Sequence, residues 1–138
     1  MQNKVISDEI VPWNDCCDDV FYPKLILYLL PVVYNKCFME SDGDPTSPCF
    51  HTCIFKMMGS YGPNGLNSKV LKRLIGSNNM MGEESGWKKQ NADKILDKCL
   101  SQIDTKSYIE CNEDLKSFSF CYFAELFMAC PDFNESNC

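Results

Sequence analysis

Hydrophobic residues recur at helical spacing in the first third of the chain, from Asp18 to about Met39. Pro23 suits the first turn of such a helix, because the missing N–H of proline is not needed there. Pro31 lies inside the same pattern, so we expect a kink or a break at that point. The recurring apolar positions are Leu25, Leu29, Val32 and Val33.

A second helix is predicted after the loop around Asp42 and Asp44. Ser47 is a good N-cap, Pro48 suits the first helical position, and Gly59 ends the apolar pattern. The segment 61–65 is a cluster of turn residues. A short third helix should then begin at Asn67 or Ser68 and close at Gly76.

Two longer helices are predicted in the C-terminal half, one from Trp87 to about Ile103 and one from about Glu113 to Cys130, with Pro131 beyond it. No stretch shows the sustained alternation of a strand. The pattern therefore predicts an all-α fold of about six helices in a single domain, residues 1–138. We expect residues 1–15 to form an extended N-terminal arm and residues 131–138 a tail tied by Cys138.

Ten cysteines among 138 residues change this picture most. Their even number indicates a disulfide framework of up to five bridges, formed in an oxidising compartment. There is no C-x-x-C motif and the only histidine is His51, so we expect neither a zinc site nor a thioredoxin-type redox site. We expect no other cofactor. The chain is thus expected to be secreted, although its first eleven residues are too polar for a signal peptide.

Charge and hydropathy narrow the range of partners. The formal net charge is −6 and the lysines form no basic run, so we expect no nucleic-acid partner. The longest apolar run, from Leu25 to Val33, is far shorter than the roughly 20 residues that cross a bilayer, so we expect no stable membrane insertion. The apolar content allows a weak homodimer.

The cysteine spacing carries geometric information. Cys49 and Cys53 are four positions apart and share one face of their predicted helix. Cys121 and Cys130 are nine positions apart, about 180° around a helix at 100° per residue. If both lie on the last helix, that helix is bridged to two different neighbours and is a central element. Composition alone leaves many connectivities open.

The cysteine pattern resembles that of insect odorant-binding proteins over nearly the whole chain, from Cys16 to Cys138. The matching features are the three-residue interval of Cys49 and Cys53, the 45 residues before Cys99, and the eight-residue interval of Cys121 and Cys130. The text Cys49-Phe50-His51-Thr52-Cys53-Ile54-Phe55 and the Leu66-Asn67 helix start are also similar. The doublet Cys16-Cys17, Cys37, Cys111, Cys138 and Pro131 after Cys130 resemble the Plus-C subclass.

The resemblance implies a compact helical domain around an internal apolar cavity. It also implies a disulfide pairing, in which Cys16 and Cys17 could be exchanged. The implied bridges are Cys17–Cys53, Cys49–Cys121, Cys99–Cys130, Cys16–Cys37 and Cys111–Cys138. The implied function is carriage of odorants, pheromones or similar hydrophobic semiochemicals through an aqueous lymph to a membrane chemoreceptor.

A carrier function also has a physical basis in the residues. Helices that are apolar on more than one side and bridged by disulfides can keep a cavity open. Seven methionines and nine phenylalanines would supply an adaptable lining. Tyr122 or Tyr61 could donate a hydrogen bond to the ligand. The candidate lining residues are Phe55, Met58, Leu71, Leu74, Trp87, Phe120, Tyr122, Phe123 and Phe127.

The two other classes of function are an enzyme and a secreted protein-binding module. An enzyme is not expected, because the doublet Cys16-Cys17 lacks the His-Asp pair of a phospholipase A2 and no other catalytic constellation stands out. A secreted protein-binding module, such as an inhibitor or effector, is the alternative, with Asp42–Pro48 and Asn78–Gly86 as candidate recognition loops. His51 could sense pH near 6.5, but an exposed polar residue is the preferred interpretation.

Overall fold

The computed structural model describes residues 24–77 and 86–131, with side chains from Pro31 onward. The described helices are α2 (Lys24–Glu40), α3 (Pro48–Met57), α4 (Ser68–Ile75), α5 (Trp87–Leu100) and α6 (Glu113–Met128). A two-stranded hairpin, β1 (Tyr61–Gly62) and β2 (Gly65–Leu66), joins α3 to α4. The all-α fold class is confirmed. The predicted N-terminal arm, Pro23 and most of the tail and of the 78–86 loop lie outside the described residues.

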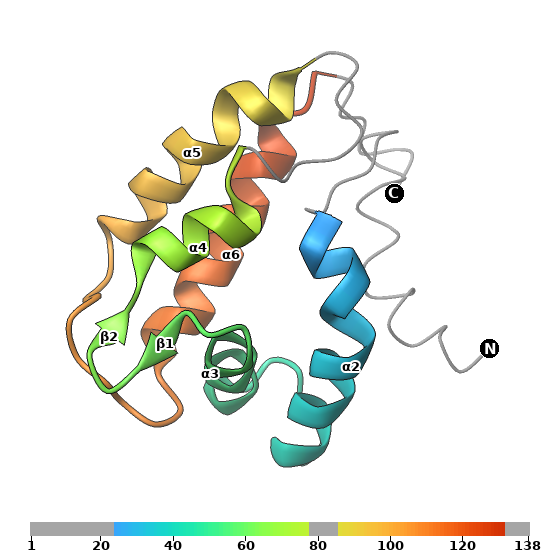
Figure 1. The fold of residues 1–138 in the computed structure, drawn as a ribbon, viewed down its shortest axis with the longest axis vertical. Coiled ribbons are helices and arrows are strands. Elements are labelled where there is room, and N and C mark those ends of the chain that lie inside the picture. Colours follow the sequence, from blue (N-terminus) through green and yellow to red (C-terminus); the bar gives the residue numbers. More distant parts are fainter. Residues whose placement is uncertain (1–23, 78–85, 132–138) are drawn as a thin grey trace.

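Helix α6 has α3 and α5 as its main neighbours. Helix α5 packs along α6, α4 lies against α5, and α3 crosses near the N-terminal end of α6. Helix α2 contacts α3 and α4 on the other side of the molecule (Figure 1). Helix α3 therefore joins the α4–α5–α6 group to α2.

Helix α2 runs through Pro31 without a break. Proline removes one backbone donor and costs a helix interior about 3 kcal/mol. Pro31 is exposed, so water can satisfy the carbonyl that loses its partner. The helix then ends near Ser41, whose hydroxyl donates to the Cys37 carbonyl at 2.9 Å.

Both ends of α3 follow the sequence prediction. The Ser47 hydroxyl accepts a hydrogen bond from the Cys49 N–H at 3.0 Å, and Pro48 occupies the first helical position. At the other end Gly59 adopts a φ of +79°, where its N–H and that of Ser60 donate to the Lys56 and Phe55 carbonyls, both at 3.0 Å. This is a Schellman motif, which needs a left-handed residue at the position of Gly59.

The hairpin before α4 was predicted only as a cluster of turn residues. Its strands are two residues long, too short for alternation to register in the sequence. The Leu66 N–H donates to the Thr105 carbonyl at 2.9 Å, which ties the hairpin to the segment before α6. Asn67 then caps α4 by accepting from the Lys69 and Val70 N–H groups, and Gly76 closes the helix as predicted.

The two C-terminal helices begin as predicted and end earlier. Helix α5 starts at Trp87 and stops at Leu100, three residues before the predicted end at Ile103. Helix α6 starts at Glu113 and stops at Met128, so Cys130 lies beyond it. The side-chain oxygen of Asn112 caps α6 by accepting from the Asp114 N–H at 2.9 Å.

Two hydrophobic clusters lie on opposite sides of α3. The main cluster joins Phe55 of α3 to the hairpin, α4, α5 and α6. The second cluster joins Phe50 of α3 to α2 through Val33, Tyr34 and Cys37. The main cluster's remaining buried residues are Tyr61, Leu66, Leu71, Ile75, Trp87, Ala92, Ile95, Leu96, Cys99, Leu115, Phe118, Tyr122, Leu126 and Cys130.

The disulfides correct the predicted pairing. The described bridges are Cys37–Cys53, Cys49–Cys111 and Cys99–Cys121. Cys130 is also disulfide-bonded. The five predicted pairs are therefore wrong: Cys17–Cys53, Cys49–Cys121, Cys99–Cys130, Cys16–Cys37 and Cys111–Cys138.

The physical reason for the error is the position of Cys111. This residue precedes α6 and lies beside the first turn of α3, with a Cα–Cα distance of 3.8 Å to Cys49. Cys121 faces α5 instead and bonds Cys99. Three of the predicted bridges joined six framework cysteines in the order first to third, second to fifth and fourth to sixth. The observed bridges follow the same order, but a different set of six cysteines forms them. This set is Cys37, Cys49, Cys53, Cys99, Cys111 and Cys121.

Candidate ligand-binding surface

Helix α6 carries two apolar stripes with different surroundings. One stripe is fully packed in the main cluster and consists of Leu115, Phe118, Tyr122 and Leu126. The other consists of Phe123 and Phe127, which are four positions apart and so share a face. Both are half-buried and pack against the main cluster from outside. The second stripe thus leaves part of its aromatic surface uncovered by the described residues.

The nine predicted lining residues divide by burial. Buried in the main cluster are Phe55, Leu71, Trp87 and Tyr122. Half-buried are Met58, Leu74, Phe123 and Phe127. Phe120 is 51% exposed. Leu74 packs on the main cluster together with the second α6 stripe, whereas Met58 belongs to the second cluster on the other side of α3. The structure therefore does not bring all nine together.

The two tyrosines considered as ligand donors already use their hydroxyls. Tyr122 donates to the Ile75 carbonyl at the end of α4, at 2.5 Å. Burial raises the pKa of Tyr122, so it remains a neutral donor. Tyr61 lies in a network before α6, where its oxygen accepts from the side-chain amide of Asn112 and the Ile109 N–H, each at 2.8 Å. Both hydroxyls thus hold the fold together.

His51 is not the exposed polar residue that the sequence favoured. Its ring makes edge contacts with Phe50 and Phe120, at centroid distances of 5.5 and 5.7 Å. Its Nε2 atom is buried and has no hydrogen-bond partner among the described residues. Burial, together with the positive charge of Lys116, lowers the pKa of His51 to about 4. The ring is therefore neutral near pH 6.5, the pH at which the sequence suggested that His51 could act as a sensor.

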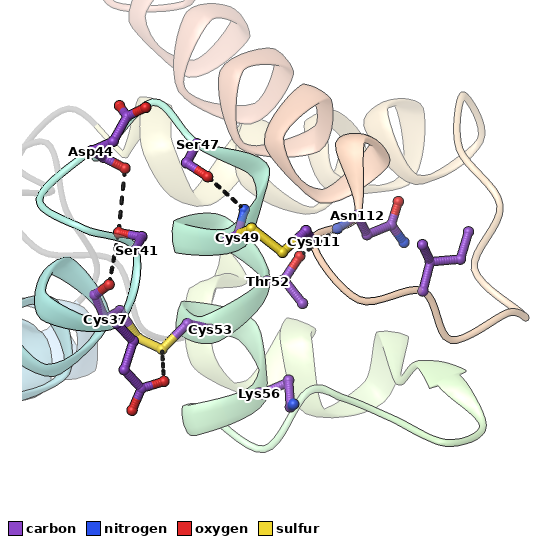
Figure 2. Close-up of a disulfide and its surroundings, with 12 residues drawn as sticks. Cys37, Ser41, Asp44, Ser47, Cys49, Thr52, Cys53, Lys56, Cys111 and Asn112 are labelled. Carbon is purple, nitrogen blue, oxygen red and sulfur yellow. Dashed lines mark hydrogen bonds between the residues drawn. A yellow bond between two sulfur atoms is a disulfide. The ribbon is translucent and has the colours of Figure 1, made fainter.

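A surface pocket of about 230 Å³ lies elsewhere, where α3 meets the end of α2 and the segment before α6. Figure 2 shows its two disulfides, Cys37–Cys53 and Cys49–Cys111, on successive turns of α3. The sequence could not reveal this pocket, because it depends on the pairing of Cys111. The lining residues are Glu40, Cys49, Thr52, Cys53, Lys56, Met57 and Cys111.

Within 24–77 and 86–131, no three His, Cys, Asp or Glu side chains gather in a way that could hold a metal ion. None of the described helices is both long enough and apolar enough to span a bilayer.

Comparison with known proteins places the fold. The family profile described as the PBP/GOBP family matches residues 33–125, well over half of the chain. Neither the curated proteins nor the solved structures contain a significant match. Members of this family are binding and carrier proteins for odorants and pheromones, not enzymes. The matched segment includes α3, α4, α5 and the six cysteines of the interleaved bridges. The chain belongs to the PBP/GOBP family, the insect odorant-binding proteins.

Proposed function

We propose that this protein is a secreted carrier of small hydrophobic molecules, which it holds against the half-buried apolar surface of α4 and α6. The observation that carries the proposal is the second aromatic stripe of α6. Phe123 and Phe127 pack against the main cluster and keep part of their aromatic surface accessible. Leu74 of α4 also packs against the main cluster and is half-buried, and we include it in the proposed surface. Family membership supports a ligand of this kind.

We expect burial of apolar surface to supply most of the binding free energy. Burial of apolar area contributes about 25 cal/mol per Å², so about 300 Å² would contribute roughly 7 kcal/mol before association costs. A micromolar dissociation constant corresponds to about 8 kcal/mol net of those costs, so a ligand of micromolar affinity would have to bury more than this area or make polar contacts as well. Because the hydroxyls of Tyr61 and Tyr122 are occupied, we expect ligand affinity to follow apolar volume more than polar head group.

The finer assignments belong to the same proposal. The ten cysteines and the Cys130-Pro131 pair support the Plus-C subclass. The ligands would be odorants, pheromones or similar semiochemicals, delivered through lymph to a membrane chemoreceptor, by a single ligand-binding domain. We propose that Leu74, Phe123 and Phe127 contact the ligand and that Phe55, Leu71, Trp87 and Tyr122 support them from within the core.

The test is titration of the fully oxidised protein with a hydrophobic fluorescent probe, followed by displacement with long-chain alcohols, esters, acids and aromatic compounds. We expect saturable micromolar binding that some of these compounds displace. Phe127→Ala should weaken probe binding several-fold, because it removes half-buried aromatic surface. Met128→Ala is the matched control, since Met128 is 77% exposed on the adjacent position.

Two results would contradict the proposal. One is the absence of saturable binding in protein whose cysteines are all oxidised, which would favour the protein-binding alternative. The other is equal weakening by Phe127→Ala and Met128→Ala, which would place the ligand away from the second stripe of α6.

A further inference from the structure

The pocket at the first turns of α3 contains two disulfides in very different chemical settings. Cys49 and Cys53 are one helical turn apart on α3, and both line the pocket together with Cys111 (Figure 2). Cys111 is exposed and Cys49 is half-buried. The partner of Cys53 is Cys37, whose exposed fraction is 0%, and Cys99 of the third described bridge is also 0% exposed. An incoming reagent can therefore reach the Cys49–Cys111 bridge most easily.

Disulfide exchange requires a sulfur that can be attacked and a sulfur that can leave as a thiolate. If Cys111 is attacked, Cys49 leaves. Cys49 is the second residue of α3, where the helix dipole stabilises negative charge and so favours a thiolate. The leaving group of this bridge is thus favourably placed.

The neighbouring bridge has the opposite arrangement. Attack on Cys53 would expel a thiolate at Cys37, inside the second cluster, where burial disfavours charge. The Glu40 Oε1 atom lies 3.7 Å from the Cys53 Sγ atom, so its negative charge repels an approaching thiolate. Both the attack and the departure are therefore less favourable at Cys37–Cys53.

Backbone conformation adds a further bias at Cys111. Its φ is +51°, in the left-handed region that non-glycine residues rarely adopt. This conformation costs about 1 kcal/mol, and the bridge to Cys49 is one of the contacts that impose it. Opening the bridge lets Cys111 leave the left-handed region, which favours the open form.

We propose that Cys49–Cys111 is a thiol-exchange site for small carboxylate-bearing thiols of the cysteine class. The thiolate of the small molecule attacks the Sγ atom of Cys111, the S–S bond to Cys49 breaks, and Cys49 leaves as a thiolate. The product is a mixed disulfide on Cys111. A second small thiol attacks the sulfur of the attached small molecule, which releases a small-molecule disulfide and the Cys111 thiolate. Two thiols are oxidised as the protein disulfide is reduced by two electrons.

The surroundings of the bridge indicate which thiols enter and what remains after exchange. Lys56 lines the pocket and carries a positive charge that attracts a carboxylate, and the Glu40 carboxylate in the same lining is paired with Lys36 at 3.5 Å. The Asn112 N–H donates to the Thr52 hydroxyl at 2.7 Å, and the Asn112 amide donates to the Tyr61 hydroxyl at 2.8 Å. These contacts join α3, the hairpin and the start of α6 without the bridge, so the fold should survive its opening.

The experiment is timed exposure of the oxidised full chain to free cysteine, followed by acid quenching, alkylation and peptide mapping by mass spectrometry. We expect alkylation of Cys49 to appear at least about tenfold faster than that of Cys37, Cys53, Cys99 or Cys121. A cysteine adduct should appear on Cys111. Earlier or simultaneous opening of either other described bridge would overturn the proposal, as would an adduct found mainly on Cys49.

A matched pair of variants tests the pocket itself. Lys56→Gln should slow exchange with cysteine several-fold and leave exchange with the uncharged 2-mercaptoethanol unchanged. Lys69→Gln, at an exposed position of α4 away from the pocket, should change neither rate. Equal rates for the two variants with cysteine would contradict the role of Lys56. Because the mapping of the unmodified protein needs no variant, the ranking of the bridges remains testable even if Lys56→Gln folds poorly.

Discussion

The hydroxyl of Tyr122 on α6 donates to the carbonyl oxygen of Ile75, the last residue of α4, at 2.5 Å. Both residues are buried, and Tyr122 is only 1% exposed. The bond satisfies a carbonyl that the end of a helix leaves unpaired. It therefore fixes the end of α4, next to Leu74, against the centre of α6.

Tyr122→Phe should lower the free energy of unfolding by about 1–2 kcal/mol, because it leaves the buried Ile75 carbonyl without a partner. Tyr108→Phe is the control: its hydroxyl accepts from the Lys56 ammonium at 2.9 Å at an exposed site, and its loss should cost under about 0.5 kcal/mol. Urea unfolding curves of the two variants measure the difference. Equal losses would contradict a structural role for the Tyr122 hydroxyl.

Alkaline pH should act through the same residue. Burial raises the pKa of Tyr122 in the folded protein above the value of about 10 that it has when unfolded. The stabilisation is thus complete below pH 10 and is lost as the pH rises above it. Unfolding curves collected from pH 8 to 11 should show a decline that is weaker in Tyr122→Phe than in the unmodified protein.

His51 offers a clean pH measurement, because it is the only histidine. Its pKa is lowered to about 4 by burial and by Lys116, below the unfolded value of about 6.5. Between these values the unfolded chain binds the extra proton, so stability is full above pH 6.5 and declines as the pH falls towards 4. NMR titration of the imidazole should give a midpoint well below 6.5, and a midpoint at 6.5 would refute the burial of Nε2.

The acid decline should depend on His51. His51→Phe keeps a ring against Phe50 and Phe120 but cannot be protonated. Discounted for the exposed part of the ring, the decline that it removes is on the order of 1–2 kcal/mol. Thermal unfolding at pH 7 and pH 5 for both proteins measures this difference, and an unchanged pH dependence in His51→Phe would assign the decline to carboxylates instead.

Two glycines with similar backbone conformations should respond very differently to alanine. At Gly65 a Cβ atom would lie 2.3 Å from the Thr105 carbonyl oxygen, and φ is +87°. At Gly59 φ is +79° but no atom lies within 4 Å of the added Cβ. We expect Gly59→Ala to cost about 1 kcal/mol from the left-handed backbone alone and Gly65→Ala at least about 3 kcal/mol. Denaturant unfolding compares them, and equal costs would contradict the close approach.

Substitutions at a core position and at a surface position of α4 should affect stability and ligand binding differently. Leu71→Ala should cost about 2–4 kcal/mol of stability, because Leu71 is buried in the main cluster. Leu74→Ala should cost about 1 kcal/mol and weaken probe binding, since Leu74 is half-buried. Calorimetry and probe titration of each variant decide between these outcomes. Unchanged probe affinity in Leu74→Ala would remove Leu74 from the ligand surface.

The helix ends were predictable because their signals are local. The residues that cap or end α3 and α4 act through hydrogen bonds to groups only a few positions away, so no tertiary information is needed to place them. They are Ser47, Gly59, Asn67 and Gly76. The end of α5 was predicted too late, because Ile103 is apolar for packing reasons although it follows the helix. The break expected at Pro31 did not occur for a similar reason, since local propensity was outweighed by packing of the rest of α2 on α3.

The candidate site was only partly predictable. Apolar periodicity correctly marked α6 as a helix with more than one apolar face, but it could not say which face is packed. Phe120 and Tyr122 were both candidate lining residues, but Phe120 is 51% exposed and Tyr122 is buried. Which face becomes core depends on where α4 and α5 pack, and this is a property of contacts between distant segments.

The amino-acid pattern by itself determined the all-α class and most helix boundaries, which depend on 3.6-residue periodicity and on capping residues and are therefore local. The interleaved order of the bridges was implied by the resemblance of the cysteine pattern to that of odorant-binding proteins. Only the tertiary structure decided which six cysteines carry that order. Nine residues separate Cys111 from Cys121, and eight separate Cys121 from Cys130. Because these intervals are nearly equal, spacing along the chain does not show which pair completes the framework. Only the crossing of α6 and α3 places Cys111 beside Cys49.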